Sequence, residues 1–275
     1  MDSVVTLLTD FGWDDPYVAE IKAVLYDQWI CLPDSTSPGT VVDLCHTIPA
    51  CDVTAGSWFL ARLHAKFPAG TVHVAVIDPG VGTERPVIAV EARDQFFVGP
   101  GNGLFSFLQD GSDFTVVRLD NPRYHRFQGE EEPAPTFHGR DIMAPVAALL
   151  ATGMSILQVG SLGTQADIGN LPVSRGSPVA EETRIGTVVW IDRFGNALTD
   201  VRRHGHKGNV LQQSRRILIG ATEVVGPYRT FGKAPAGQPF WYWGSGDCLE
   251  AAISGENAAE RYGWRRGLAV SLLGA

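Results

Sequence analysis

The first part of the chain alternates between runs that predict strands and runs that predict helices. Residues 4–9 are almost entirely apolar and β-branched, as in a buried strand. After Asp14-Asp15-Pro16, which is typical of a helix N-terminus, apolar side chains recur on one face at helical spacing. The same criteria predict strands at 40–44, 71–77, 86–91, 94–98 and 114–119, and helices at 52–67 and 141–152. This alternation indicates an α/β domain with a mainly parallel sheet flanked by helices.

The pattern changes after residue 170. Residues 171–183 are rich in Pro, Ser, Gly and charge and predict a linker, and the polar, Pro-rich segment 31–39 predicts a connection inside the first domain. Short strand-like runs follow at 185–191, 215–219, 222–225, 239–243 and 267–273, with one short helix near 256–262. We therefore expect an α/β domain over 1–170 and a smaller, mainly β domain over 184–275, built as a barrel or a sandwich.

Two of the predicted strands end on an aspartate that leads into a glycine turn. Asp10 follows the strand at 4–9, and Asp78 follows the strand at 71–77. In a parallel α/β sheet, ligands bind in the crevice beyond the carboxyl ends of the strands. We therefore expect both carboxylates to lie at the edge of a binding crevice.

Residues 78–85, with the sequence DPGVGTER, are the densest candidate for chemistry. Gly80 and Gly82 permit positive φ and close approach of the backbone to a ligand. Asp78 and Arg85 bracket the loop and are placed to form a charge pair. The same residues also fit an ordinary turn between strands with a surface ion pair, which contributes little. The nearby GPGNG at 99–103 lacks the Lys-Ser/Thr of a P-loop, so we expect it to be a structural turn.

Two other segments combine reactive side chains at the ends of predicted elements. In TFHGRD at 136–141, His138 can present its ring to a cleft at a helix entrance. The alternative is that Asp141 caps the helix and His138 makes only a local hydrogen bond. IDRFGN at 191–196 offers an acid, an aromatic ring and an amide, which suit an ammonium group and a nucleobase. The alternative there is a hairpin turn in which Gly195-Asn196 supplies positive φ.

Composition excludes several classes of function. The net charge of −8 comes from 30 acidic and 22 basic residues, and the bases are scattered, which argues against a nucleic-acid partner. No apolar stretch approaches the ~20 residues that span a bilayer, and no signal-peptide pattern precedes the first strand. The histidines and the four cysteines lack metal-ligand spacing, so we expect no metal site, and the thiols beside apolar runs are expected to be buried. These features predict a cytoplasmic protein without membrane segments.

The segments together resemble one family, the S-adenosyl-L-methionine (SAM) hydroxide adenosyltransferases. These are adenosine-forming SAM hydrolases related to the SAM-dependent fluorinase and chlorinase. The resemblance covers both domains in order, through TDFG (9–12), DPYVAEIKAV (15–24), VVDLCHTIP (41–49), HVAVIDPGVGTER (73–85), TFHGRDIMAPVAA (136–148) and IDRFGNALTD (191–200). The DPGVG…R and FHGRD segments are the most specific.

The resemblance implies SAM as the substrate, no cofactor, and an Asp–Arg–His set that positions and activates water. This set falls on Asp78, Arg85 and His138, while Asp10 is implied to hold the ribose hydroxyls. The remaining implied contacts are to the methionine amino group and the adenine, from Asp192, Phe194 and Asn196, and to the methionine carboxylate, from Ser245. The resemblance also implies a homotrimer, with each site between the first domain of one subunit and the second domain of a neighbour.

The chemistry of SAM hydrolysis is compatible with Asp78, Arg85 and His138 as the residues that position water. A sulfonium leaves as a neutral thioether, so the reaction needs no general acid, but it needs a nucleophile held in line with the ribose C5′–S bond. Arg85 favours an anionic nucleophile, and Asp78 and His138 can accept hydrogen bonds from water. The alternatives are halide-dependent adenosyl transfer and a non-catalytic SAM or adenosine sensor. Where the fluorinase has a tyrosine this chain has Asp78, whose charge repels a halide, so we favour hydrolysis.

Three features differ from the halogenases. Cys51 lies where the fluorinase has a tryptophan beside the substrate, so we expect a more open wall there. Gly246 replaces the arginine that partners the carboxylate-binding serine. The segment 31–39 is an insertion that we expect to change a loop or an oligomer contact.

Overall fold

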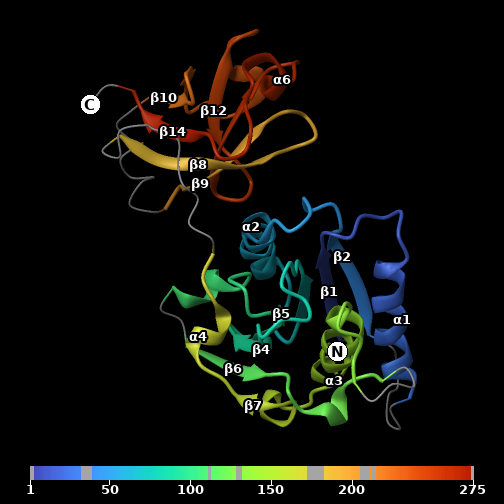
Figure 1. The fold of residues 1–275 in the computed structure, drawn as a ribbon. Coiled ribbons are helices and arrows are strands. Elements are labelled where there is room, and N and C mark those ends of the chain that lie inside the picture. The colour runs from blue at the N-terminus through green and yellow to red at the C-terminus, as the bar shows by residue number, and fades with distance from the viewer. Residues whose placement is uncertain are drawn as a thin grey trace. The chain divides into compact units, whose positions relative to one another are not determined.

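The computed structural model describes residues 3–31, 39–110, 113–127, 132–171, 183–204, 211 and 215–273. The chain divides into two compact units, Met1–Pro172 and Val173–Ala275 (Figure 1). The predicted linker at 171–183 and the predicted connection at 31–39 lie outside the described residues except at their ends. Each unit has its own hydrophobic core.

The first unit is built on a mixed sheet, which has seven strands within the described residues, in the order β2-β1-β3-β5-β4-β6-β7. The strands are β1 (Val4–Thr9), β2 (Thr40–Cys45), β3 (Val72–Val76), β4 (Val87–Ala92), β5 (Gln95–Pro100), β6 (Phe114–Arg118) and β7 (Ser161–Leu162). Strands β2, β1, β3 and β5 pair in parallel, as expected from the alternation. Strands β4, β6 and β7 join in antiparallel fashion.

The sheet reverses direction at the β4–β5 hairpin. Its two turn residues, Arg93 and Asp94, have φ values of 54° and 58°. Positive φ at both central residues is the conformation of a two-residue type I′ turn, whose twist matches that of the flanking strands. This local turn, which the alternation of elements does not reveal, makes half of the sheet antiparallel.

Helices cover both faces of the sheet. They are α1 (Tyr17–Ile30), α2 (Val53–Leu63), α3 (Ala144–Ala151) and the short α4 (Gln165–Ile168). Helices α1 and α3 pack together on the face to which Val74 and Val76 of β3 belong. Helix α2 covers the other face, where a Cβ on its Gly56 would lie 2.8 Å from the Cδ1 of Ile77. Strands β1 and β3 are therefore buried on both sides.

The ends of the helices differ from the sequence predictions in two places. Helix α1 begins at Tyr17, directly after the predicted Asp14-Asp15-Pro16 start, but Pro16 is at its N-cap and neither aspartate caps it. The predicted helix at 141–152 starts two residues earlier, as a π-helical turn at Gly139–Met143 that continues into α3. By contrast, the Asp52 carboxylate caps α2 by accepting from the Ala55 N–H at 2.8 Å.

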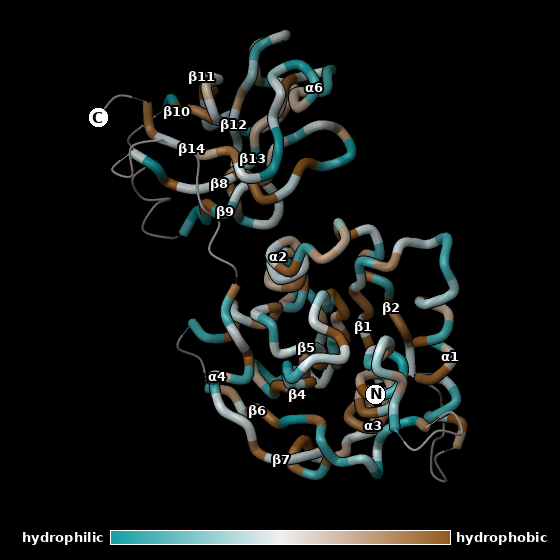
Figure 2. Tube along the Cα trace, viewed as in Figure 1, coloured by the Kyte–Doolittle hydropathy of each residue, from teal (hydrophilic) through white to brown (hydrophobic). Residues whose placement is uncertain are grey.

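Hydrophobic residues concentrate along β1 and α3 in the first unit (Figure 2). Single 3₁₀ turns connect the main elements at His64–Lys66, Ser106–Gln109, Pro122–Tyr124, Ile156–Gln158 and Phe231–Lys233. In the described part of the chain, no helix combines the length and the apolar character that a membrane span requires.

The second unit is a closed barrel, as expected for a small β domain. Its strands are β8 (Arg184–Ile191), β9 (Ala197–Arg202), β10 (Arg216–Ile219), β11 (Thr222–Val225), β12 (Pro239–Trp243), β13 (Cys248–Ile253) and β14 (Ala269–Leu272), with helix α6 at Ala258–Tyr262. The order around the barrel is β10-β11-β12-β13-β9-β8-β14. Strands β9 and β13 were not predicted. The sequence of β13, CLEAAI, has only one β-branched residue, so its pairing with β12 and β9 makes it a strand.

Candidate active site

Asp10 and Asp78 lie at the same edge of the sheet. Strands β1 and β3 are parallel neighbours with Thr9 opposite Val76, so the residues that follow them leave the sheet together. This is the placement expected from the two strand ends. The two carboxylates nevertheless have different partners.

Asp78 forms a bidentate ion pair with Arg85. The Arg85 Nε donates to the Asp78 Oδ1 at 2.8 Å, and its Nη2 donates to the Asp78 Oδ2. The two side chains are only 5% and 9% exposed. The charge pair predicted from the sequence is therefore present, but the alternative of a surface ion pair is wrong. Parallel N–H···O bonds of this kind fix the guanidinium plane as well as its position.

Two backbone hydrogen bonds stabilise the loop between Asp78 and Arg85, and a glycine lets it pack closely against a neighbouring segment. The N–H groups of Val81 and Thr83 donate to the carbonyls of Asp78 and Gly80. Gly82 has a φ of +76°, and a Cβ there would lie 2.6 Å from the carbonyl oxygen of Pro135. Only glycine accommodates both the dihedral and the contact. The loop thus presses against the segment that leads to His138.

His138 completes a three-residue cluster. Its Nδ1 lies 3.1 Å from the Arg85 Nη2. The π-helical turn begins directly after it, at Gly139, where a Cβ would lie 3.1 Å from the Cγ1 of Val76. The absence of a side chain at 139 lets the turn approach the end of β3. Single π-turns of this kind are frequent at functional sites.

The contact with Arg85 determines the proton position on His138. A guanidinium only donates, so Nδ1 must accept and the neutral ring must carry its proton on Nε2. Partial burial lowers the pKa of His138, and the positive charge of Arg85 lowers it further, against smaller opposing effects of Asp78 and Asp141. The ring is therefore held neutral, with Nε2–H as a donor. The sequence interpretation had His138 accept a hydrogen bond from water instead.

Arg85 keeps one buried donor without a partner. Its Nη1 is inaccessible and makes no hydrogen bond to any part of the chain that the structure describes. Buried polar groups are almost always paired, and an orphan costs about 1–3 kcal/mol. A water molecule or an anion would satisfy it only after a shift of the surrounding side chains, because the atom has no accessible surface.

The Asp10 carboxylate is held by the backbone. The Cys51 N–H donates to its Oδ2 at 2.8 Å. Burial raises the pKa of Asp10, and the charge of Asp78 adds to that effect, while the backbone N–H bonds oppose it. Cys51 has a φ of +62°, uncommon for a residue with a side chain, and this conformation directs its N–H at Asp10. No sequence signal identifies this contact.

An aromatic cluster joins the Asp10 turn to the His138 segment. The rings of Phe11, Tyr17 and Phe137 meet edge to face, with centroids 5.5–5.8 Å apart. The guanidinium of Arg140 lies 4.9 Å from the Phe137 ring and also bonds to Asp141. The Asp141 carboxylate accepts from the Ala134 N–H at 3.0 Å, so it anchors the preceding loop instead of capping the helix.

Asn102 is a further residue that the sequence did not single out. It lies in the GPGNG segment, where its Nδ2 donates to the Ile77 carbonyl at 2.9 Å. Ile77 directly precedes Asp78, so this hydrogen bond connects the end of β5 to the start of the 78–85 loop. Its part in the structure is therefore that of a supporting turn, as expected.

In the second unit, Asp192, Phe194 and Asn196 share the β8–β9 hairpin. The Asp192 Oδ1 accepts from the N–H groups of Phe194 and Asn196, and its Oδ2 accepts from the Asn196 Nδ2 at 2.8 Å. Gly195 has positive φ and Asn196 does not, so the hairpin alternative is partly realised. The Phe194 ring is 71% exposed. The turn thus presents an exposed ring, whereas Asn196 is buried, with 7% of its surface exposed.

Ser245 lies apart from that hairpin. It is exposed in the turn between β12 and β13, where the Arg203 N–H bonds to the Asp247 carbonyl. Arg203 follows the end of β9, whereas the hairpin precedes its beginning. Ser245 and Asn196 therefore lie at opposite ends of strand β9, on the order of 15–20 Å apart at ~3.3 Å per residue. An elongated ligand is needed to contact both.

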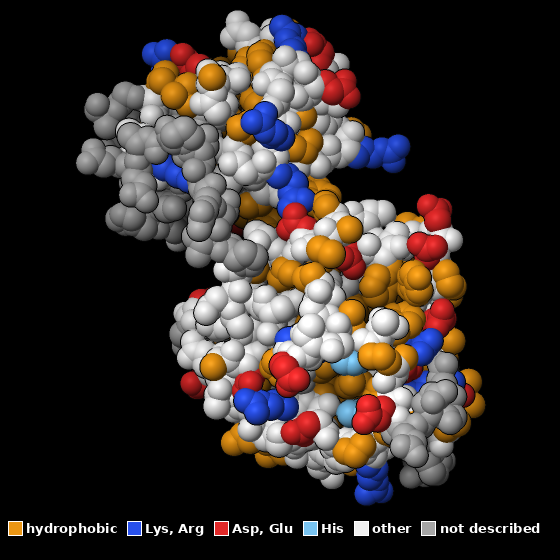
Figure 3. Space-filling model, viewed as in Figure 1, with side chains coloured by type: hydrophobic (Ala, Val, Ile, Leu, Met, Phe, Trp, Pro, Cys, Tyr) orange, Lys and Arg blue, Asp and Glu red, His pale blue; other side chains and the backbone are white. Residues whose placement is uncertain are grey.

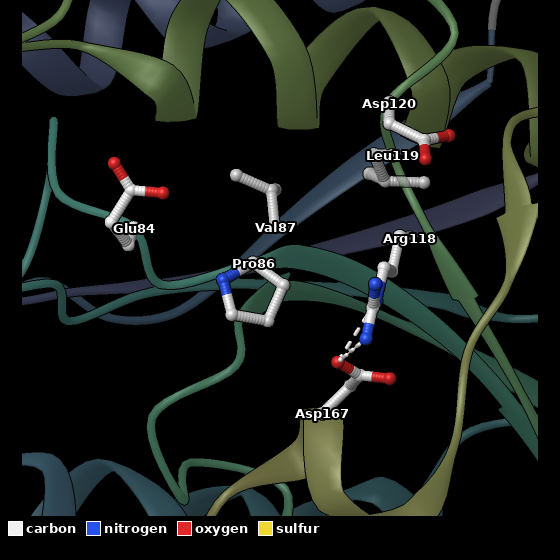
Figure 4. A pocket seen from close by; sticks show the side chains of 7 residues that line it. All are labelled: Glu84, Pro86, Val87, Arg118, Leu119, Asp120 and Asp167. Atoms are coloured by element: carbon white, nitrogen blue, oxygen red, sulfur yellow. Dashed lines mark hydrogen bonds and ion pairs between the residues drawn. The ribbon is translucent and has the colours of Figure 1, made fainter.

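The surface of the first unit also has a hollow away from this cluster. A hollow of about 340 Å³ is lined by Glu84, Pro86, Val87, Arg118, Leu119, Asp120 and Asp167. Figure 4 shows Arg118 and Asp167 joined as an ion pair, with the other two carboxylates standing apart. None of the predicted site residues lines it. On the face shown in Figure 3, acidic and basic side chains are interspersed.

The cysteines are unpaired thiols, but their burial differs from the prediction. Cys248 is buried, whereas Cys31 and Cys51 are exposed. Within the described residues, no group of three or more His, Cys, Asp or Glu side chains could hold a metal ion.

Known proteins match the chain along almost its full length. The model of the SAM hydroxide adenosyltransferase N-terminal domain matches residues 5–160, and that of the C-terminal domain matches residues 186–271. A protein of Thermus thermophilus named (R)-S-adenosyl-L-methionine hydrolase is 36% identical, over 98% of this chain and 99% of that protein. A protein of the same name from Salinispora tropica is 33% identical, over 94% of this chain and 93% of that protein.

A solved structure agrees with these matches. The crystal structure of an uncharacterized conserved protein from Thermotoga maritima superimposes with a TM-score of 0.82 and 28% identity, covering 98% of this chain and 100% of that one. The matched domains, the fold and the segments around Asp78 and His138 all indicate the same family. The chain belongs to the SAM hydroxide adenosyltransferase family.

Proposed function

We propose that the protein hydrolyses SAM to adenosine and L-methionine. Hydroxide, or water that releases a proton to solvent, attacks the ribose C5′ in line with the C5′–S bond. A C–O bond forms, and the electron pair of the C–S bond passes to sulfur, which leaves as the thioether of methionine. The observation that supports the proposal is the Asp78–Arg85–His138 cluster in a chain of this family, in which Arg85 bonds to Asp78 and His138 through Nε and Nη2 and keeps Nη1 without a partner.

Three side chains form the proposed nucleophile site. Once a small shift exposes it, the buried Arg85 Nη1 donates to the attacking oxygen, and the positive charge of the guanidinium favours the anionic form of that nucleophile. Asp78 holds the guanidinium in one plane. The His138 Nε2–H is a second donor, which orients the oxygen. Such a donor-rich site binds a hydroxide better than it deprotonates a water.

The remaining residues are proposed to bind the substrate. Asp10 accepts from the ribose hydroxyls, and the exposed Phe194 ring stacks on the adenine. The Asn196 Nδ2 is already bonded to Asp192, which leaves its Oδ1 to accept from the adenine amino group. Asp192 contributes negative charge for the methionine ammonium, and Ser245 donates to the carboxylate.

We further propose a cytoplasmic homotrimer whose sites combine the first domain of one subunit with the second domain of a neighbour. The unpaired thiols support a reducing compartment. The division of the proposed site residues between two units supports a shared site, because each unit carries only part of the set. Static light scattering of the purified protein measures the mass and tests the trimer.

Product analysis tests the reaction. We expect purified protein incubated with SAM to release adenosine and methionine in equal amounts. A 5′-halogenated adenosine that appears only with added halide would instead indicate a halogenase. A bound nucleoside without turnover would indicate a sensor.

Substitutions test the roles of the cluster. We expect Asp78→Ala and His138→Ala to lower kcat at least ~100-fold, because each removes part of the preorganised nucleophile site. The affinity for SAM, measured by calorimetry, should change little. Asp120→Ala is the control, since it removes a carboxylate of the hollow in Figure 4 outside the cluster. Full activity in both cluster variants would contradict the assigned roles.

A further inference from the structure

A series of hydrogen bonds connects helix α1 and strand β2 to the turn that contains Asp10. The Lys22 Nζ donates to the Asp43 Oδ2 at 2.6 Å, and the Asp43 Oδ1 lies 2.9 Å from the His46 Nε2. The His46 Nδ1 lies 2.8 Å from the Thr9 Oγ1, and that oxygen accepts from the Phe11 N–H at 3.3 Å. Thr9 and His46 are fully buried.

In this series of hydrogen bonds, each donor and each acceptor can be assigned in only one way. A carboxylate only accepts, so the His46 Nε2 carries a proton for Asp43. In the neutral ring, Nδ1 then accepts from the Thr9 hydroxyl, and the Thr9 oxygen is free to accept from Phe11. Each link therefore orients the next, from α1 and β2 to the end of β1. We call Lys22, Asp43, His46 and Thr9 the Thr9–His46 network.

The same connection after β2 also holds the turn through its backbone. The His46 carbonyl accepts from the Gly12 N–H at 2.7 Å, and the Cys51 N–H donates to the Asp10 carboxylate at 2.8 Å. The Trp13 ring meets the His46 ring edge to face, with centroids 4.5 Å apart. Asp10 is thus fixed on both sides, at the residue before it and at the residues after it.

We infer that the Thr9–His46 network positions Asp10 for the ribose, so that His46 and Thr9 are positioning residues for substrate binding. The inference rests on the proposed function in that it assigns Asp10 to the ribose hydroxyls. Two buried hydrogen-bonded groups at the end of a strand restrict the turn more tightly than packing alone. A shift of the Asp10 carboxylate by a fraction of an ångström weakens directional bonds to two neighbouring hydroxyls.

The chain contains a matched control for this network. Thr6, also on β1, forms the same kind of buried pair with His73, with 2.7 Å between its Oγ1 and the His73 Nδ1. Both Thr6 and His73 are fully buried. This pair lies inside the sheet, three residues before Thr9, and has no contact with the Asp10 turn. Thr→Val at either position removes a hydroxyl and preserves shape.

The test compares Thr9→Val with Thr6→Val. We expect similar falls in the midpoint of thermal unfolding for both variants. Only Thr9→Val should raise the KM for SAM and the Kd for adenosine, about tenfold, as for the loss of one well-placed hydrogen bond. The kcat of Thr9→Val should stay within about threefold, and Thr9→Ser, which keeps the hydroxyl, should restore the affinity. Equal KM values for Thr9→Val and Thr6→Val would overturn the inference.

A double variant separates positioning from general loss of structure. In the Asp10→Ala background, Thr9→Val should have no further effect on adenosine affinity, because its target is absent. Full additivity of the two changes would contradict the inference. If the unmodified protein releases no adenosine from SAM, the proposed function fails, and the adenosine affinities of the same variants still decide whether Thr9 acts through Asp10.

Discussion

At the scale of single residues, the important variable is which atom of a polar side chain remains free. Arg85 uses Nε and Nη2 on Asp78 and His138 and leaves a buried Nη1. His138 is left with a donor, because its Nδ1 accepts from Arg85. The two aspartates that open the site are consequently unequal. Asp78 is neutralised by a bidentate partner, whereas Asp10 accepts the Cys51 N–H and has a pKa raised by burial.

The buried His73 predicts how stability depends on pH. Burial, and then the charge of His64, lower the pKa of His73 from 6.5 to about 4. The neutral ring therefore contributes its full stability above pH 6.5, and this contribution falls as the pH drops from 6.5 through about 4. A shift of this size corresponds to about 3 kcal/mol. Urea unfolding at pH 7, 5.5 and 4.5 measures the loss in the free energy of unfolding.

A variant isolates this contribution from other acid effects. His73→Phe removes the titrating group, and Phe97, which stacks on His73 with centroids 5.0 Å apart, can pack against the new ring. The free energy of unfolding of His73→Phe should fall less steeply between pH 6.5 and 4 than that of the unmodified protein. Equal pH slopes would show that His73 titrates normally.

At the scale of elements, the site depends on how closely three connections approach one another. The loop after β3, the turn after β1 and the segment before α3 each come from a different part of the sequence. Gly82 allows the first to touch Pro135, and Gly139 allows the third to touch Val76. The edge-to-face rings of Phe11, Tyr17 and Phe137 join the second to the third.

The contact at Gly82 can be tested against a glycine of equal dihedral. Gly82 and Gly70 have φ values of +76° and +79°, but a Cβ at Gly70 would have no neighbour within 4 Å. Gly70→Ala should cost about 1 kcal/mol, the strain of a left-handed residue with a side chain. Gly82→Ala should cost about 2–3 kcal/mol or more and lower kcat, since the loop must move away from Pro135. Chemical unfolding and SAM turnover measure both.

If Gly82→Ala loses no more stability than Gly70→Ala and keeps full turnover of SAM, then the close approach of the loop to Pro135 does not position Arg85.

At the scale of the whole molecule, the proposed site residues are divided between two units. The cluster of Asp78, Arg85 and His138 belongs to Met1–Pro172, and the hairpin with Phe194 belongs to Val173–Ala275. Within the barrel, Ser245 and Asn196 lie at opposite ends of β9, which suits the two ends of an elongated substrate. A subunit-shared site follows from the proposed trimer and makes a quantitative prediction.

Mixed oligomers test whether a site is shared. Asp78→Ala inactivates the first unit, and Phe194→Ala/Ser245→Ala changes two exposed residues of the second. When chains of the two kinds are refolded together in equal amounts, about one quarter of the sites should combine two unmodified units, so about a quarter of the activity should return. SAM turnover of the mixture, against each variant alone, measures this fraction.

The matched control mixes two variants of the same unit. Asp78→Ala with His138→Ala should recover nothing, because every site that they form carries one of the two defects. Absence of recovery in the first mixture, with mixed oligomers verified by mass, would place each complete site within one chain.

The sequence by itself determined the elements and the candidate residues. Periodicity and turn residues are local, so strands β1 to β6, helices α1 to α3 and the barrel-like second unit were predictable from short stretches of sequence, whereas the two-residue β7 was not. The segments around Asp78, His138 and Asp192 were recognisable for the same reason. The weakly β-forming β13 and the antiparallel half of the sheet were not, because pairing with neighbours decides them.

Only the tertiary structure decided what those residues do to one another. Arg85 and His138 are 53 positions apart in the sequence, and nothing in the sequence signals their contact or the proton that the contact assigns to Nε2. The same holds for the Cys51 N–H on Asp10 and for the network from Lys22 to Thr9. Hydrogen bonds are short and directional, so partners far apart in the chain are set by packing, which one strand or helix cannot encode alone.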